Sequence, residues 1–407
     1  MSLSSFIQHS IAPLMEQSFL IWGLYPIHAG PDDPFTPDIP LRESGDLPMT
    51  AQLLSPARLH DLDLRNHMVM APMTRSRADA AGVPRASTAT YYAQRASAGL
   101  IISEAINISA DAVGSPLTPG LYSEAQIVAW QQVTAAVRAA GGKIFAQLWH
   151  TGRVGHSSVR GGSLPVAPSA VAIQGQQHFT LDGMQDYEVP RELTLSEIRA
   201  VIADFRCAAQ NAKRAGFDGV ELHAAFGYLP NQFLVDSANL RIDEYGGSIA
   251  KRSRFVLEVM QALIEVWGSA RVGIKLSPVI PFNSMIDSDP LGLYSYLLGE
   301  LNTLQPGYVH LMRALFPLDN FPHWPRDVLA TFGPLSRSPV IANGGYDAAS
   351  GEAALKAGEA ALVSFGTPFV ANPDLPERFA RGAELAQADR ATLYGGEDAG
   401  FIDYPTL

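Results

Sequence analysis

Eight short apolar segments, each followed by residues with helical spacing, constrain the fold of this chain more than any other feature. Each segment is nearly continuous in hydrophobicity, which is typical of parallel strands that are buried on both faces. The segments span residues 67–72, 100–105, 143–150, 219–225, 272–278, 308–314, 340–345 and 361–366. We therefore predict eight buried strands along the chain.

The residues between the strands show the periodicity of amphipathic helices. One helix is predicted to begin at the capping box Thr194-Leu-Ser-Glu197 and to stop before Gly216. Another carries an apolar stripe between Phe255 and Trp267. Eight strand–helix units predict an α/β fold of the (β/α)8 TIM-barrel type. A doubly wound sheet is the rival fold, but no GxGxxG motif follows the first strand, and eight units suit a closed barrel better.

The segment 151–193, between the third and fourth predicted strands, is rich in Gly, Ser, Pro and Gln. We predict that it is an excursion over the barrel mouth and that it carries its own hairpin. In such barrels the chemistry lies at the carboxyl ends of the strands. The candidate site residues are therefore those that end the predicted strands, namely Thr74, Gln147, Trp149, His223, Tyr228, Lys275, Gly344 and Gly345.

Composition argues against several other classes of function. The formal net charge is −11, and no basic cluster is interleaved with aromatic residues, so nucleic-acid binding is disfavoured. No apolar stretch is long enough to span a bilayer. A single cysteine, Cys207, rules out an intrachain disulfide; it lies in an amphipathic helix pattern and is predicted to pack in the core of the protein. The ten histidines are scattered, so no metal site is expected, and these features suit a cytoplasmic protein.

The first 48 residues differ from the rest of the chain. An apolar patch is followed by a Pro- and acid-rich tail, and Glu16 is the only charge before the patch, unlike in a secretory signal. We expect residues 1–48 to be a flexible extension or the result of a start codon assigned too early, with targeting as the weaker alternative. Residues 49–407 are expected to form a single domain.

Nine motifs, in the same order along the chain, resemble the Old Yellow Enzyme family of flavin-dependent ene-reductases. The resemblance covers nearly all of residues 52–407, and the motifs are APMTRSRA, YYAQRASAGLIISEA, FAQLWHTGR, ELHAAFGYLPNQFL, RIDEYGGSIAKRSRFVLEV, KLSP, FNSM, FGTPFVANPDLPERF and GFIDYP. The resemblance implies a barrel that holds non-covalent FMN. NADPH or NADH would reduce the flavin, which would then pass hydride to an activated C=C bond.

The resemblance also implies how the flavin is held. Pro72, Met73, Thr74 and Ala105 would line the ring, with the Thr74 hydroxyl near O4, and Gln147 would bind the pyrimidine edge. Lys275 stands where the family usually has Arg near N1 and O2, which keeps the charge and loses the planar fork. The phosphate would lie against Gly344, Gly345, Gly366 and Thr367, where Thr367 replaces a family Arg, so FMN affinity is expected to be weaker.

In the family, the fourth-strand motif supplies two donors to the substrate's carbonyl or nitro oxygen and then a proton donor. His223 fills the first donor position, Phe226 replaces the second donor, and Tyr228 fills the position of the proton donor. Trp149, Tyr394 and Ser115 are expected on the substrate side; the family often has an aromatic residue at the position of Ser115. We leave His150 undecided, and we expect His310 to be a buried strand residue, Asn283 to line the mouth and residues 243–247 to form a structural loop.

Three functions remain open from the sequence. The leading one is reduction of an electrophilic alkene, an α,β-unsaturated carbonyl or nitro compound, with a substrate range altered by Phe226 and Ser115. The second is isomerisation of an enal or enone, or reduction of a quinone, on the same cofactor. The third is a catalytically weakened flavin-binding accessory protein. The choice of NADPH or NADH, and of monomer or homodimer, is also open.

Overall fold

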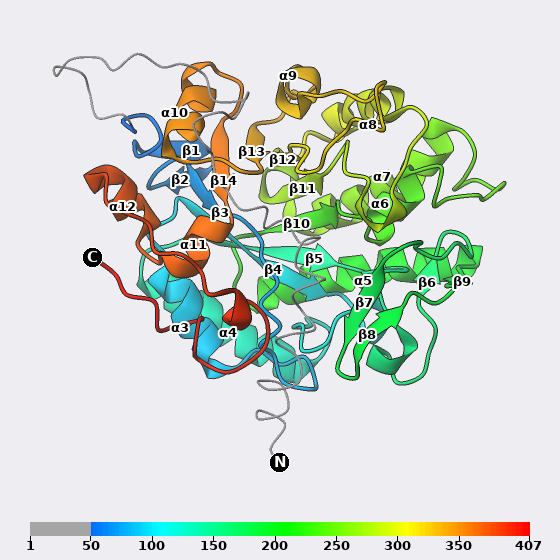
Figure 1. Ribbon diagram of the computed structural model, residues 1–407, viewed down its shortest axis with the longest axis horizontal. Coiled ribbons are helices and arrows are strands. Elements are labelled where there is room, and N and C mark those ends of the chain that lie inside the picture. The colour runs from blue at the N-terminus through cyan, green and yellow to red at the C-terminus, as the bar shows by residue number, and fades with distance from the viewer. Residues whose placement is uncertain (1–49) are drawn as a thin grey trace.

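The computed structural model describes residues 50–407, and these contain a closed barrel of eight parallel strands (Figure 1). The predicted (β/α)8 barrel is therefore confirmed. Each predicted strand is observed within a few residues of its expected bounds. In spatial order the strands are β3 (Met68–Met70), β4 (Leu100–Asn107), β5 (Ile144–Trp149), β10 (Gly219–Ala224), β11 (Val272–Leu276), β12 (Tyr308–Met312), β13 (Val340–Asn343) and β14 (Leu362–Phe365), which pairs with β3.

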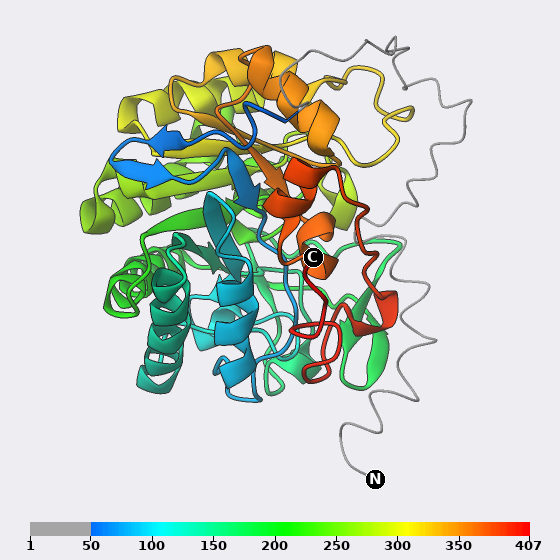
Figure 2. The same cartoon turned by 90° about the vertical axis from the view of Figure 1, so that its left-hand side faces the viewer.

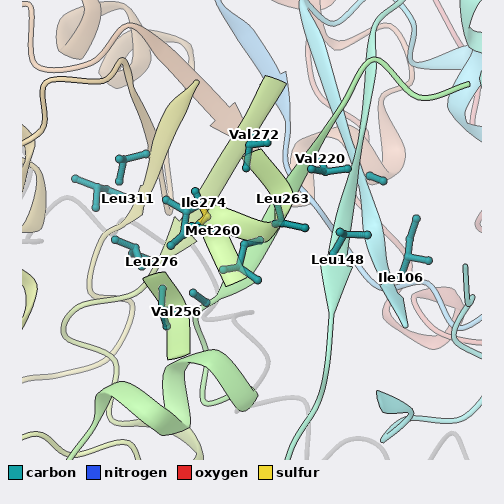
Figure 3. Close-up of a cluster of buried hydrophobic side chains, with 14 of the residues drawn as sticks. Ile106, Leu148, Val220, Val256, Met260, Leu263, Val272, Ile274, Leu276 and Leu311 are labelled. Atoms are coloured by element: carbon teal, nitrogen blue, oxygen red, sulfur yellow. The ribbon is translucent and has the colours of Figure 1, made fainter. Parts of the chain in front are cut away.

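Helices surround this barrel. They are α3 (Ala86–Gln94), α4 (Glu124–Ala139), α5 (Leu195–Arg214), α6 (Leu229–Leu234), α7 (Ile249–Trp267), α8 (Pro290–Leu304), α9 (Val328–Phe332), α10 (Ala348–Lys356), α11 (Thr367–Ala371) and α12 (Leu375–Arg381). The predicted capping box of α5 is present, with the Thr194 side chain accepting from the Glu197 N–H and Glu197 from the Thr194 N–H. In Figure 3, Val256, Met260 and Leu263 of α7 face the apolar residues of β11.

Cys207 is exposed on α5, so its predicted burial in the core was wrong. The buried stripe of this helix includes Phe205, Ala208 and Ala209. A residue two positions after Phe205 is rotated by about 200°, which turns Cys207 away from the barrel.

The amino-terminal end of the barrel is closed by an apolar plug. The antiparallel hairpin of β1 (Ala57–Leu59) and β2 (Leu62–Leu64) contributes Leu59, Leu62 and Leu64 to one cluster with residues from the beginnings of the barrel strands. Figure 2 shows this hairpin on the opposite side of the barrel from the C-terminal segment. Since this end is filled by packed apolar side chains, the carboxyl ends of the strands remain as the place for a site.

The segment between β5 and α5 carries the antiparallel hairpin of β7 (Gln177–Thr180) and β8 (Gly183–Asp186), as well as the short paired strands β6 (Val166–Ala167) and β9 (Arg191–Glu192). Tyr187, directly after β8, packs against the cluster that contains Trp149 and Tyr228. The excursion therefore contributes to the walls at the carboxyl ends of the strands.

The C-terminal segment is held beside α3 (Figure 2) by two arginines that follow β3. Arg75 donates to the carbonyls of Leu393 and Gly400, and Arg77 donates to those of Thr392, Glu397 and Ala399. Among the helices of residues 50–407, none has the length and apolarity needed to cross a bilayer. The predicted extension, residues 1–48, lies outside the described residues.

Candidate active site

His223, Tyr228 and Trp149 form one aromatic cluster at the carboxyl ends of β5 and β10. The ring centroids of His223 and Tyr228 are 4.8 Å apart, with 73° between the planes. Trp149 meets Tyr228 edge-on, with centroids 4.9 Å apart and an angle of 85°. Trp149 ends β5, His223 lies near the end of β10, and Tyr228 directly precedes α6, so three separate backbone elements fix the cluster.

Burial keeps both His223 and Tyr228 uncharged. Desolvation, with Lys275 and His310 nearby, holds the pKa of His223 well below its ordinary value. Desolvation also raises the pKa of Tyr228 well above 10, with contributions from Tyr187 and Tyr394. At neutral pH the cluster therefore presents a neutral imidazole and a protonated phenol, each with a hydrogen to donate.

Phe226 lies between His223 and Tyr228 in the sequence, and its backbone has a left-handed conformation, with φ +57°. Its N–H donates to Ser277 Oγ at 2.9 Å, and its carbonyl accepts from Asn283 Nδ2 at 2.8 Å. The half-buried ring packs with the Trp149 cluster on one side and with Ile280, Phe282 and Met312 on the other. Such a conformation is unfavourable for a bulky residue, so these two hydrogen bonds hold it in place.

A buried carboxylate that the sequence analysis did not single out organises the barrel interior below the cluster. Glu221 Oε1 accepts from Gln147 Nε2 at 2.7 Å, and Glu221 Oε2 lies 2.9 Å from His310 Nδ1. His310 Nε2 in turn lies 2.7 Å from Ser364 Oγ. Glu221 and His310 are fully buried, as expected for His310. The bond from Nε2 fixes the Gln147 amide and leaves its carbonyl oxygen available to another donor.

Lys275 lies on β11 between His223 and His310, with which it is paired in register. It is 5% exposed, and burial lowers its pKa to about 8, partly opposed by Glu221. Within residues 50–407, no carboxylate lies within ion-pair distance of its ammonium group. A buried cation without an ion pair is costly, so this position favours an anionic ligand.

The residues predicted to line a flavin ring lie on neighbouring strand ends. Pro72, Met73 and Thr74 are half-buried after β3, and Ala105 packs in the cluster with Trp149 and Tyr228. Ala105 is paired with Gln147, and the register between β4 and β5 shifts just before this pair. A Cβ atom built on Gly366 would lie 3.5 Å from Met73 Sδ. The residues that follow β14 and β3 are therefore close together.

The predicted phosphate turns follow β13 and β14. Gly344 and Gly345 have φ angles of +107° and +67°, which favour glycine. Within the described residues, the backbone N–H groups of Gly345, Gly366 and Thr367 donate to no protein acceptor. Thr367 is exposed and begins α11. Unpaired N–H groups on adjacent glycine turns are typical of an anion-binding concavity.

The remaining predicted residues belong to other segments of the fold. Tyr394 is half-buried in the C-terminal segment, and burial raises its pKa to about 12. Ser115 follows Gly114, whose carbonyl accepts from His178 of the β7–β8 hairpin. His150 is buried and accepts from the Gly152 N–H at 3.0 Å, so it serves a structural contact. Residues 243–247 form a structural loop as expected, with Asp243 accepting from Arg241 and from the Tyr245 N–H.

A sequence profile of the NADH:flavin oxidoreductase / NADH oxidase family matches residues 52–386. The chain belongs to this family. It is 42% identical to 12-oxophytodienoate reductase 1 of Oryza sativa subsp. japonica, over 87% of this chain and 93% of that protein. It is 39% identical to the flavin oxidoreductase hxnT of Emericella nidulans, over 89% of this chain and 99% of that protein.

Solved structures of the family superpose on this barrel. Morphinone reductase matches with a TM-score of 0.83 and 45% identity, over 87% of this chain and 96% of that one. The Old Yellow Enzyme homologue from Zymomonas mobilis matches with a TM-score of 0.84 and 41% identity, over 88% and 100% of the two chains. The predicted membership of the Old Yellow Enzyme family is thereby confirmed. The chain is therefore an FMN-dependent oxidoreductase of the NADH:flavin oxidoreductase type.

The residues of this Old Yellow Enzyme family member fit FMN. Lys275 offers a cation that forms no ion pair within residues 50–407, and Gln147 offers an oriented amide carbonyl. The turns after β13 and β14 offer N–H groups that have no acceptor within the described part of the chain. Within residues 50–407, no group of three or more His, Cys, Asp or Glu side chains is placed to hold a metal ion.

Sequence reasoning missed several residues that shape the site, among them Glu221, Tyr187, Arg75 and Arg77. A signal existed for Glu221, because a carboxylate inside the apolar run GVELHAA needs a buried partner. Tyr187 lies in an irregular excursion, where no periodicity indicates which side chains turn inward.

Proposed function

We propose that this chain is an ene-reductase that reduces the C=C bond of α,β-unsaturated carbonyl or nitro compounds, with His223 as donor to the substrate oxygen and Tyr228 as proton donor. When bound and reduced, FMN supplies the hydride. The observation that carries the proposal is the ring contact between a neutral imidazole and a protonated phenol at the carboxyl end of the barrel.

His223 is suited to polarise the substrate. A neutral imidazole can donate one N–H to a carbonyl or nitro oxygen, and this bond strengthens as negative charge develops there. Its Nδ1 is buried and has no partner among residues 50–407. Donation to the oxygen draws electron density away from the β-carbon, which makes that carbon a better hydride acceptor.

Tyr228 is suited to complete the reduction. Its pKa, raised well above 10, keeps the hydroxyl proton in place until the α-carbon becomes basic. The edge-on contact with Trp149 holds the phenol ring in one orientation. A fixed proton donor favours net reduction over isomerisation of the same substrate.

Phe226 is expected to set the substrate range. The family's second oxygen donor is absent, and an apolar ring in contact with Ile280, Phe282 and Met312 takes its place. Loss of one such donor typically costs about 2.7–4 kcal/mol of transition-state stabilisation. We therefore expect the enzyme to prefer strongly activated alkenes with an apolar substituent near Phe226.

Anaerobic half-reactions test this function. The purified yellow protein should bleach with NADPH or NADH and regain its colour when 2-cyclohexenone or a nitroalkene is added. Colour that returns with quinones but with neither alkene would favour quinone reduction. Protein that cannot be loaded with FMN would favour the accessory role.

A further inference from the structure

Arg313 lies beside the glycine turn that is predicted to bind the FMN phosphate. It directly follows β12, and its backbone N–H donates to Asn343, the last residue of β13, at 2.9 Å. Its Nε donates to the Gly344 carbonyl at 3.0 Å. A Cβ on Gly345 would lie 3.9 Å from Arg313 Nη2. The guanidinium group is therefore next to both glycines of the turn.

Among the residues that the structure describes, the Arg313 guanidinium is held by an aromatic contact and has no ionic partner. Its Cζ lies 3.9 Å from the centroid of the Tyr346 ring, so the planar group is stacked on an aromatic face. Within residues 50–407, no carboxylate forms an ion pair with Arg313, and only Nε is engaged in a hydrogen bond. The two terminal nitrogens remain available, and together they have the fork geometry that binds a phosphate.

Among residues 50–407, the two that flank the same turn on its other side, Gly366 and Thr367, carry no charge. Barrel order places β13 between β12 and β14, so the Gly344–Gly345 turn has Arg313 on one side and Gly366–Thr367 on the other. Thr367 offers a hydroxyl and an unpaired N–H group where the family resemblance implies an arginine. A phosphate dianion bound only by N–H groups would keep most of its charge uncompensated.

We propose that Arg313 is a phosphate ligand of FMN in this chain and supplies, from the β12 side of the turn, the cation that position 367 does not. This inference rests on the proposed FMN-dependent function. The guanidinium is already stacked and anchored through Nε, so it needs little further ordering when the phosphate binds. It should therefore bind the phosphate more tightly than a flexible lysine at this position would.

The test compares FMN with riboflavin, which has the same ring and lacks the phosphate. Full-length apoprotein is titrated with each flavin, and the dissociation constants are measured by quenching of flavin fluorescence. Arg313→Gln and Arg313→Ala should weaken FMN binding on the order of ten- to a hundredfold and leave riboflavin binding unchanged. Arg337→Ala, at an exposed arginine that precedes β13 at the other end of the barrel, serves as the control and should change neither constant.

A double variant tests whether an arginine on either flank of the turn can bind the phosphate. Thr367→Arg in the Arg313→Ala background should restore preference for FMN over riboflavin. The inference is overturned if the Arg313 variants keep the wild-type preference, or if both flavins are weakened equally, since the arginine would then only support the turn. A wild-type chain that binds neither flavin would contradict the proposed function itself.

Discussion

The phenol of Tyr228 meets the imidazole of His223 at 73°, with 4.8 Å between the ring centroids, although His223 belongs to a barrel strand and Tyr228 to the loop before α6. The pKa of each group is shifted by burial toward its neutral form. The contact thus joins the hydrogen-bond donor to the substrate oxygen with the proton donor, and at neutral pH each is in the protonation state that its proposed role requires.

Tyr228→Phe should separate the two half-reactions. The variant keeps the ring and its contacts with Trp149 and loses only the transferable proton. We expect the alkene half-reaction to slow by roughly a hundredfold or more, while flavin reduction by NADPH or NADH is unchanged. Stopped-flow absorbance measures both. An alkene rate equal to that of the wild type would remove Tyr228 from the reaction.

The pH dependence of the wild-type alkene half-reaction tests the same group. Since burial raises the phenol pKa well above 10, deprotonation of Tyr228 should not lower this rate below about pH 10.

Phe226→Asn should raise the rate on simple enones. Asparagine tolerates the left-handed conformation better than phenylalanine and restores a donor at this position. Relief of backbone strain, about 1 kcal/mol or more, offsets a similar loss of packing from a half-buried ring, so we expect little change in Tm. Steady-state kinetics with 2-cyclohexenone measure the effect. Phe226→Ala, which removes the ring without adding a donor, should show no such gain.

Lys275→Met should stabilise the apoprotein at neutral pH. The folded pKa of Lys275 is about 8, against an ordinary value of 10.5, so charge burial costs about 3 kcal/mol. This cost is fully present below pH 8 and disappears as the pH rises toward 10.5, because only the unfolded chain then still binds the proton. The difference in Tm between variant and wild type should shrink over this range. Lys275→Arg should show no gain at pH 7, and equal Tm differences at pH 7 and 10.5 would refute the assignment.

Glu221→Gln should weaken both the fold and the cofactor site. The carboxylate accepts from Gln147 and faces His310, whereas an amide has a single acceptor oxygen, so the contact with His310 survives only if the imidazole changes tautomer and accepts from the new amide. We expect a loss of about 2 kcal/mol in the free energy of unfolding, together with weaker FMN binding because the Gln147 amide loses its orientation. Thermal melts and flavin titrations measure these effects. The exposed Glu384→Gln provides a matched control, and an unchanged FMN affinity would show that Glu221 does not orient Gln147.

The sequence alone determined the eight strands, the capping box of α5 and the family. Short apolar runs bounded by Gly and Pro specify buried strands by local chemistry, and the motifs at their ends keep their order along the chain. Cys207 was misplaced although the helical period, applied residue by residue, turns it outward.

Only the tertiary structure decided which residues meet. Gln147, Glu221, His310 and Ser364 are far apart in the chain, and barrel closure with its strand register brings them into one buried network. The strained backbone of Phe226 depends on hydrogen bonds with Ser277 and Asn283, and the place of Arg313 beside Gly345 depends on the pairing of β12 with β13. Local propensity contains no information on such contacts, because they arise between side chains that become neighbours only when the strands pair.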